Sequence, residues 1–393
     1  MILSYGVLVL KGSIFKKPIC AVLAAILIAG CFYTGTGASA ANKSFEQDGF
    51  TFTIIDSENL LVSLKKAPEE AGDGYYIPAR IRHRKKTYTI TEIGNAAYAF
   101  TDIEDAAIPG TVTKIGDSAF AGCSALKHVY IPAGLESIGN GVFSYCDGLT
   151  DIEIDPENKA FVFLKGILYS ADMKKLLWGS GSVKASCEVA DGTVEICSYA
   201  FEGNKIITKV KLPTSLHKIG SGAFMDCSVL KNVTISKNVK TIEGNPFMYC
   251  PALESISVAK GNKSYSADKS GLLLNARKTS LVSASAARGD IELPETVKKI
   301  VKGAAAGNTG ITSVTINSKV KTIEEFAFAD CSSLAKVIFK SRKTVLPEEG
   351  GVFKNTYYYL DVTVPYPSGS GVQGDFEDLI RSNSPNGVIV IWR

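Results

Sequence analysis

The chain has 393 residues, of which 46% are hydrophobic, and a formal net charge of +4 at pH 7. Three lysines and no acidic residue fall in the first forty positions, so 40 basic and 39 acidic side chains remain after Ala40. This apolar content allows a large core. The charge balance lacks the basic excess of a nucleic-acid-binding or polybasic membrane-binding protein, and we expect neither nucleic acid nor a lipid surface as a partner.

The first forty residues are predicted to be a targeting segment. Lys16 and Lys17 precede an apolar run over 19–30, which is typical of an export leader and too short for an ordinary membrane-spanning helix. Two processing sites are open: removal of 1–30 would leave Cys31 as a lipidated N-terminus, and removal of 1–40 would leave an unlipidated mature chain. Either site predicts an exported protein of the periplasm, outer membrane or cell surface, and membrane contact is expected only in the lipidated form, through its anchor at Cys31.

Residues 41–92 are predicted to form a small antiparallel β cap. Alternating apolar residues predict four strands, over 50–55, 60–64, 75–82 and 87–90. The segment runs directly into a repeat that starts at Ile93, and a solenoid needs a cap to cover its first open core edge.

An isoleucine recurs along the chain at spacings of 22, 23 or 58 residues. The spacing of 23 occurs four times and the spacing of 58 occurs twice, and this regularity indicates a repeat array. We therefore predict a solenoid over residues 93–340. The anchor isoleucines are Ile93, Ile115, Ile138, Ile196, Ile219, Ile242, Ile300 and Ile323.

Each short unit has three parts. It opens with I-G-x-x-A-F, as at 115–120, whose apolar spacing predicts a short helical or 3₁₀ turn. A turn that ends in Cys follows, and then L-x-x-V-x-I-P, as at 126–132, which alternates like a half-buried strand. One unit cannot bury its apolar side alone, so successive coils must stack.

Two units, 138–195 and 242–299, are longer than the others and carry the same kind of insertion. We predict that each insertion forms a β-hairpin and an additional coil. Trp178 is expected to pack inside the protein rather than to stack on a ligand, because its counterpart in the second insertion is Val282.

The pattern loosens in the last segment, 341–393. We predict a degenerate repeat there, with a strand over 360–365, followed by an α+β C-terminal cap. This cap would contain a short helix over 372–381 and a final strand over 388–392, and together they would close the far edge of the solenoid.

The repeat motifs resemble the BspA-like (Treponema-type) leucine-rich repeat family of bacterial surface proteins. The match is best at 115–132, 219–235 and 323–339. The resemblance implies a right-handed leucine-rich repeat solenoid, with a strand and a short helix or 3₁₀ turn in each coil. It also implies adhesion to host matrix proteins or attachment between cells. Two units depart from the motif, since Val301 replaces its glycine in one and Glu243 replaces it in the other.

Seven positions lie eight residues after an anchor isoleucine and hold either Cys or Asn. A slot shared by these two residues indicates a buried turn ladder, in which a small side chain bonds neighbouring backbone, rather than disulfides or a metal site with C-x₂₋₄-C spacing. Cys187 and Cys197 lie outside the ladder, and the sequence leaves open whether they pair. The ladder residues are Cys123, Cys146, Asn204, Cys227, Cys250, Asn308 and Cys331.

The sequence carries no recognised catalytic or cofactor motif. The three histidines, His83, His128 and His217, fall in different units, and no G-x-S-x-G, H-E-x-x-H, P-loop or dinucleotide fingerprint occurs. We therefore predict a protein that is not an enzyme and binds no cofactor or metal. Since a catalytic set is recognised by geometry, a hydrolase with a cryptic site is kept as a third hypothesis.

The outward-facing positions of the repeat strands are the candidate binding face. Stacked coils should align these positions in two continuous rows, a surface of the kind that solenoids use for binding. The expected partner is a host or bacterial surface protein or a glycan, and the alternative is a structural envelope component without a soluble ligand. The candidate residues are His128, Tyr130, Asp151, Glu153, Lys209, Lys211, Asn232, Thr234, Ser255, Ser257, Ser313 and Thr315.

Overall fold

The computed structural model describes residues 43–68, 75–348, 350–357, 360–365, 373–384 and 388–392. The predicted leader and both of its processing sites lie outside these residues. In the part of the chain that is described, no helix is long and apolar enough to cross a membrane.

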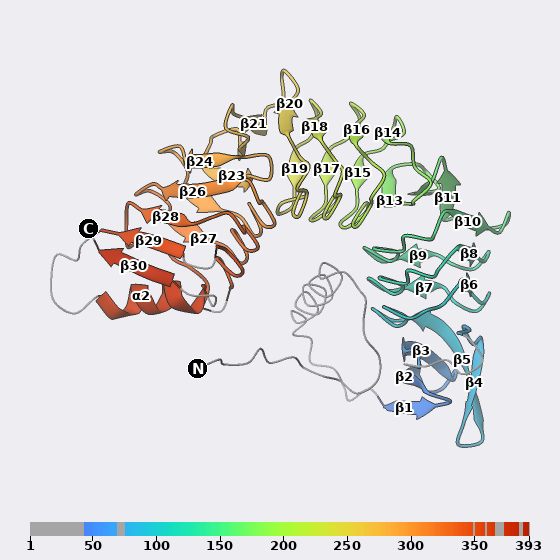
Figure 1. Ribbon diagram of the computed structural model, residues 1–393. Coiled ribbons are helices and arrows are strands. Elements are labelled where there is room, and N and C mark those ends of the chain that lie inside the picture. The colour runs from blue at the N-terminus through green and yellow to red at the C-terminus, as the bar shows by residue number, and fades with distance from the viewer. Residues whose placement is uncertain are drawn as a thin grey trace. The chain divides into compact units, whose positions relative to one another are not determined.

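The repeat array is a solenoid, as predicted. Each coil contributes a two-residue anchor strand, and these strands pair in parallel with one isoleucine beside the next (Figure 1). Ile115 lies beside Ile93 and Ile138, Ile219 beside Ile196 and Ile242. The anchor strands are β7 (Lys114–Ile115), β9 (Ser137–Ile138), β15 (Glu195–Ile196), β17 (Lys218–Ile219), β19 (Thr241–Ile242), β25 (Lys299–Ile300) and β27 (Thr322–Ile323).

A second set of strands carries the L-x-x-V-x-I motif and forms three separate parallel sheets. We call these the outer strands. The first sheet contains β6 (Asp105–Ala107), β8 (His128–Ile131) and β10 (Asp151–Ile154). The second contains β14 (Ser186–Glu188), β16 (Lys209–Lys211), β18 (Asn232–Ile235) and β20 (Ser255–Val258). The third contains β24 (Gly289–Glu292), β26 (Ile311–Ile316), β28 (Lys336–Phe339), β29 (Leu360–Val364) and β30 (Val388–Trp392).

The N-terminal cap is a mixed sheet, so the prediction of an antiparallel cap was wrong. β3 pairs in parallel with β5, and Leu64 lies beside Ile93. The physical reason is that β5 continues into the anchor ladder, where β3 takes the place of a preceding coil. An additional strand, β1, had no clear sequence signal. The cap strands are β1 (Ser44–Gln47), β2 (Phe50–Asp56), β3 (Leu61–Lys66), β4 (Arg80–His83) and β5 (Lys86–Ile93).

Both long units contain the predicted hairpin and additional coil. The last hairpin strand, β13 or β23, pairs in parallel with the next anchor strand and so replaces one anchor position. Trp178 on β13 is buried and packs edge-on against Phe143, with 5.3 Å between ring centroids. The hairpin strands are β11 (Phe161–Leu164), β12 (Ile167–Ser170) and β13 (Lys175–Gly179), then β21 (Tyr265–Ala267), β22 (Leu273–Asn275) and β23 (Ser280–Ser283).

The segment after each anchor is a chain of turns, and the predicted helical or 3₁₀ conformation was wrong there. The Ala97 N–H bonds within its own coil, to the Gly94 carbonyl at 3.3 Å, whereas the Tyr98 N–H donates to the Ala119 carbonyl of the next coil at 2.8 Å. Backbone φ is positive at the third and seventh residues after the anchor, as at Ser118 and Gly122. A helix would use its amides internally, while this arrangement leaves alternate amides to join the coils.

Aromatic side chains from the I-G-x-x-A-F motif stack from coil to coil in the core. Ring centroids are 5.2 Å apart for Phe201 and Phe224, and 5.7 Å apart for Phe224 and Phe247. Each such contact stabilises by about 0.5–1.5 kcal/mol beyond area burial. Among the described residues, the α-helix is α2 (Gln373–Ser382), which lies next to β30 at the C-terminal end.

Candidate functional site

The candidate binding face is divided into three sections, so the predicted continuous rows were wrong. Asp151 on β10 and Lys209 on β16 belong to different sheets, because β14 of the additional coil lies beside β16 instead. Ser255 and Ser313 are separated in the same way, and Asp290 on β24 lies beside Ser313. The outward residues of these two strands were not predicted from the sequence. They are Ser186, Glu188, Asp290 and Glu292.

The first section is acidic and largely paired with itself. His128 Nε2 lies 3.6 Å from Glu153 Oε2. The Tyr130 hydroxyl donates to Asp155 Oδ2 at 2.7 Å, which raises the pKa of Tyr130 and lowers that of Asp155. Asp151 on the neighbouring strand is exposed.

The second section is polar and mostly uncharged. The Ser255 hydroxyl donates to Asn232 Oδ1 at 2.6 Å, and the hydroxyls of Thr234 and Ser257 lie 2.9 Å apart. All four side chains are exposed. The charged residues of this section lie on the neighbouring strands β14 and β16, where Lys209 is exposed and Lys211 forms an ion pair with Glu188. The strands β18 and β20 thus present hydroxyl and amide groups in register, and this arrangement suits hydrogen bonding to a ligand.

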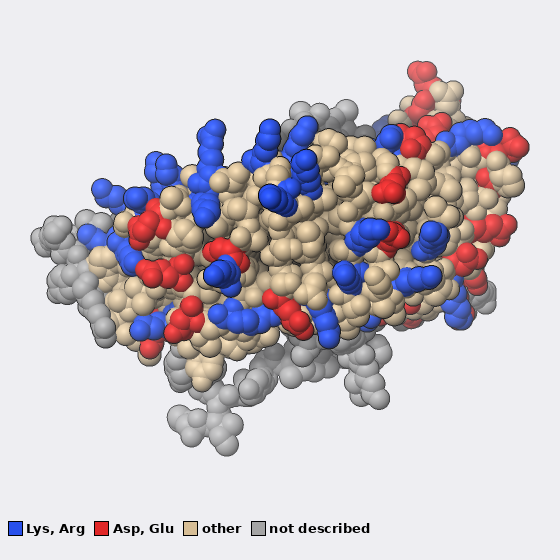
Figure 2. Space-filling model, turned by 90° about the horizontal axis from the view of Figure 1, so that it is seen from above, with Lys and Arg blue, Asp and Glu red and all other residues tan. Residues whose placement is uncertain are grey.

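The third section combines hydroxyl groups with one carboxylate. Asp290 Oδ1 accepts hydrogen bonds from Thr312 at 2.8 Å and Ser313 at 2.7 Å, and these bonds lower its pKa. Thr315 is half-buried beside Glu292. Figure 2 looks down from the top of Figure 1, where β14 to β20 lie, and shows acidic and basic side chains mixed over much of this side.

The predicted turn ladder lies inside the coils, away from the binding face. Each ladder thiol donates to a carbonyl of the preceding coil, as from Cys227 to Phe201 at 3.2 Å and from Cys331 to Ala305 at 3.2 Å. Burial raises the pKa of the Cys331 thiol to about 12. Cys123, Cys146 and Cys250 bond in the same way, to Tyr98, Phe120 and Phe224.

Asparagine occupies the ladder slot where the preceding neighbour is a hairpin rather than a regular coil. The Asn308 amide donates to three carbonyls, of Ala284, Ser285 and Ala287, and its oxygen accepts from Gly310 at 2.7 Å. Asn204 reaches the Ser180 carbonyl at 3.1 Å. The asparagine side chain is longer than that of cysteine, so its amide reaches carbonyls that a hairpin presents in a different direction from a regular coil.

The cysteines of the described residues form neither a bridge nor a metal cluster. Cys187 and Cys197 are both free, which answers whether they pair. In the described part of the chain, no group of three or more His, Cys, Asp or Glu side chains is placed to hold a metal ion.

A hollow of about 250 Å³, which was not predicted from the sequence, lies where the first long unit meets the next coil. Glu202 lines it and is only 6% exposed, and burial raises the pKa of this carboxyl to about 7. Burial also raises the pKa of nearby Asp226 to about 6, although the charge of Lys205 opposes this. Lys205 forms an ion pair with Asp147 at the rim. A signal existed in the repeat, since the position of Glu202 holds Ala121 in a regular coil.

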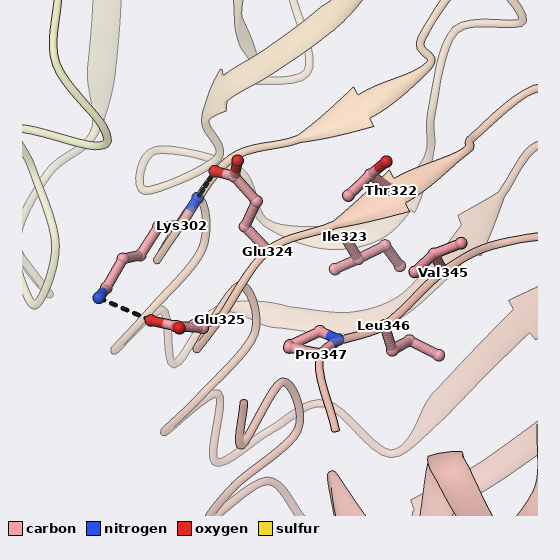
Figure 3. A pocket seen from close by; sticks show the side chains of 8 residues that line it. All are labelled: Lys302, Thr322, Ile323, Glu324, Glu325, Val345, Leu346 and Pro347. Carbon is pink, nitrogen blue, oxygen red and sulfur yellow. Dashed lines mark hydrogen bonds and ion pairs between the residues drawn. The ribbon is translucent and has the colours of Figure 1, made fainter. Parts of the chain in front are cut away.

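A second hollow, of about 420 Å³, lies at the C-terminal end of the anchor ladder (Figure 3). Its charged groups pair with one another: Lys302 Nζ lies 2.7 Å from Glu325, and the Lys302 N–H donates to Glu324 at 2.9 Å. Val345, which is 61% exposed, lies on the opposite side with Leu346 and Pro347. Figure 3 shows the charged residues on one side of the hollow and the apolar residues on the other, with Thr322 on the apolar side.

Stacked parallel coils with an anchor isoleucine, a Cys/Asn slot and an outer strand define a leucine-rich repeat solenoid. The model of the BspA type leucine rich repeat region matches six copies over residues 84–163, 182–268 and 284–368, which is more than half of the chain. The chain therefore belongs to the BspA-type leucine-rich repeat family.

Solved structures of leucine-rich repeat proteins are similar to this chain over most of its length. A leucine rich cell surface protein from Faecalibacterium prausnitzii is 20% identical, with a TM-score of 0.43, over 90% of this chain and 96% of the other. The pneumococcal vaccine antigen PcpA is 16% identical, with a TM-score of 0.36, over 90% and 100%. A leucine-rich repeat protein from Bacteroides ovatus is 17% identical, with a TM-score of 0.35, over 89% and 99%. The comparison with curated proteins gave no match.

Proposed function

We propose that this chain is an exported cell-envelope protein whose outer strands bind another protein or a glycan, and that it serves adhesion to host or neighbouring cells. Membership of a family of leucine-rich repeat surface proteins supports a repeat-based binding role. The scaffold is typically non-catalytic. The predicted leader supports export, with release at Ala41 or lipid anchoring at Cys31 as its two forms.

The observation that carries the proposal is the uncharged polar section on β18 and β20. Asn232, Thr234, Ser255 and Ser257 are exposed and in register on adjacent parallel strands. Their hydrogen bonds join them to one another, so the groups are already ordered before a ligand arrives. Pre-ordering reduces the entropy lost on binding.

A binding screen tests the proposal. Residues 41–393 would be immobilised and exposed to matrix proteins, bacterial surface proteins and a glycan array. We expect saturable binding that falls at least tenfold when Asn232, Thr234 and Ser257 are replaced by Ala. A control variant replaces exposed Ser124, Thr150 and Ser332, which lie outside the outer strands, and should bind normally. Repeated absence of saturable binding, or equal loss in both variants, would count against the proposal.

Two further measurements distinguish its parts. Mass spectrometry of the mature N-terminus in the native cell separates lipidation at Cys31 from cleavage before Ala41, and an unprocessed Met1 would contradict export. Cross-linking in the native cell should capture different ligands under different conditions. One fixed envelope partner, with no soluble ligand, would favour the structural alternative.

A further inference from the structure

Eight lysines gather along the edge formed by the turns that follow β18, β20, β24, β26 and β28. All eight are exposed, and among the described residues the ion pairs of this region use Lys218, Lys299, Lys302 and Lys340 instead. We call the eight residues the lysine ridge. They are Lys237, Lys240, Lys260, Lys263, Lys298, Lys319, Lys321 and Lys343.

Parallel pairing of the coils puts the ridge residues in two groups, one after β18 and β20 and the other after β24, β26 and β28. Lys237 and Lys240 follow β18, Lys260 and Lys263 follow β20, and these strands pair in parallel. Adjacent strands lie about 4.8 Å apart. The Lys237 side chain extends across the next coil, since a Cβ added at Gly261 would lie 3.2 Å from Lys237 Cε. Figure 2 shows basic side chains in a row along one long edge of the molecule.

The same edge is acidic or neutral in the N-terminal coils. It carries Glu136, Asp155, Glu157 and Asp191 in the turns after β8, β10 and β14, and the lysine of these turns, Lys159, lies 3.7 Å from Glu157 and is paired with it. Within the ridge segment, the acidic residue Glu295 lies 3.7 Å from Lys340 and is paired with it. The nearly balanced charge of the whole chain therefore conceals a division between acidic and basic coils.

A row of unpaired lysines is an electrostatic cost that a polyanion can remove. Two like charges 4 Å apart in water repel by about 1 kcal/mol, and screening in salt limits the effect to neighbours within about 8–10 Å. A bound polyanion neutralises the row and releases the counterions condensed on the polymer.

The surroundings of the ridge select among polyanions. The eight ridge lysines and the outward side chains of β18 and β20 include no aromatic residue and no arginine, the groups that stack on bases or read their edges, and the neighbouring Tyr265 and Arg342 are both half-buried. Among the large apolar side chains exposed in the described residues, only Val345 lies near the ridge, so an apolar face for entering a bilayer is lacking. The hydroxyl and amide groups of the adjoining face match a ligand rich in hydroxyl groups.

We propose that the lysine ridge and the adjoining face of β18 and β20 bind an extended acidic polysaccharide, with the lysines on its sulfate or carboxylate groups and the face on its hydroxyl groups. This rests on the proposed function and specifies its ligand class. Several coils take part, so a chain of sugars that spans several coils binds more tightly than a single disaccharide.

The test uses residues 41–393 with heparin and hyaluronate as the sulfated and carboxylated probes. The ridge variant carries Lys→Gln at positions 237, 240, 260 and 263. The control variant carries Lys→Gln at 85, 86, 165 and 184, which are exposed lysines outside the ridge, and so has the same net charge. We expect the ridge variant to bind heparin at least tenfold more weakly in 0.15 M NaCl. The slope of log Kd against log salt should fall by about 2–4 for four lost contacts, and the control should change neither value.

Three outcomes would overturn the inference. Equal weakening in both variants would mean that net charge alone attracts the probe. Tighter ridge-dependent binding of duplex DNA, or of vesicles containing phosphatidylserine, would assign the ridge to another kind of polyanion. No binding of either polysaccharide, while the chain binds a neutral glycan or a protein through β18 and β20, would reject the ridge as a site and leave the proposed function standing.

Discussion

The buried carboxyl of Glu202 makes stability depend on pH, and Glu202→Gln should remove most of that dependence. The folded pKa is about 7, against an ordinary value of 4.5. The folded protein therefore holds the proton more tightly than the unfolded chain does. The stabilisation from this group is fully present below pH 4.5 and is lost as the pH rises through about 7.

The size of the effect follows from the difference in pKa. At 1.36 kcal/mol for each pKa unit, ionising Glu202 in the folded protein costs about 3 kcal/mol at pH 8. Glutamine keeps the shape and the hydrogen-bonding capacity without the charge. Glu202→Gln should match the original chain at pH 4.5 and exceed its stability by up to about 3 kcal/mol at pH 8. The variant keeps Asp226, whose folded pKa is about 6, so a smaller loss of stability remains as the pH rises through about 6.

Trp178 lines the same hollow and provides a local probe. The chain has two tryptophans, so Trp392→Phe leaves Trp178 as the only fluorescent one. Urea unfolding would be followed at pH 4.5, 6 and 8 in this background, and a local probe is needed because repeat arrays unfold in parts. Glu254→Gln, at an exposed outer position, is the matched control and should change nothing. Equal stability of Glu202→Gln and the parent at pH 8 would refute the reasoning.

Three other predictions concern the coil interior. In thermal unfolding, Gly203→Ala should destabilise the protein by about 2 kcal/mol, because Gly203 has φ +76° and a Cβ there would lie 2.5 Å from the Tyr145 ring. The control is Gly110→Ala, which should be neutral because open space surrounds this glycine. Asn308→Ala should lower the free energy of unfolding by about 3 kcal/mol, because it leaves buried carbonyls without a hydrogen bond. Asn238 makes one exposed hydrogen bond to the Thr214 carbonyl, so Asn238→Ala should cost under about 1 kcal/mol. Similar losses in both variants would contradict the role of Asn308 in the ladder. Thiol labelling of the folded chain at pH 8 should modify half-exposed Cys197 before buried Cys187. Burial raises the pKa of Cys197 to about 11 and that of Cys187 to about 12. Labelling in the reverse order would contradict the burial of these two side chains.

The solenoid could be predicted because its period is carried by residues that the fold cannot replace freely. The anchor isoleucines face the core in register, so their spacing reports the coil length directly. The hairpins were predictable because both long units repeat them. The turn conformation was not, since Ile, Ala and Phe at 115, 119 and 120 suit a helical turn as well as a chain of β-turns. The inter-coil amide bonds that decide between the two are made only after stacking.

The candidate site was less predictable than the fold. The outward residues of each outer strand alternate with buried ones, as predicted. The neighbours across a long unit were not predicted, because β14 and β24 lack the leucine that opens the motif, with Lys184 and Arg288 in its place. Glu202 and the lysine ridge depend on which coils lie beside each other. The net charge of the whole chain does not show that the acidic and basic residues of the edge lie in different coils. The replacement of an alanine by Glu202 indicates a perturbed carboxyl only once the burial of this side chain is known.

The asparagine in the ladder slot has a consequence for how such a chain can lengthen. Asn204 and Asn308 each stand where a hairpin ends and regular coils resume, and the order of long and short units from Ile138 is repeated from Ile242. A duplicated block of this kind brings its own adaptor residue to the junction, so a further copy would meet a boundary that already fits. Growth by whole blocks would thus extend the molecule without any new interface having to evolve.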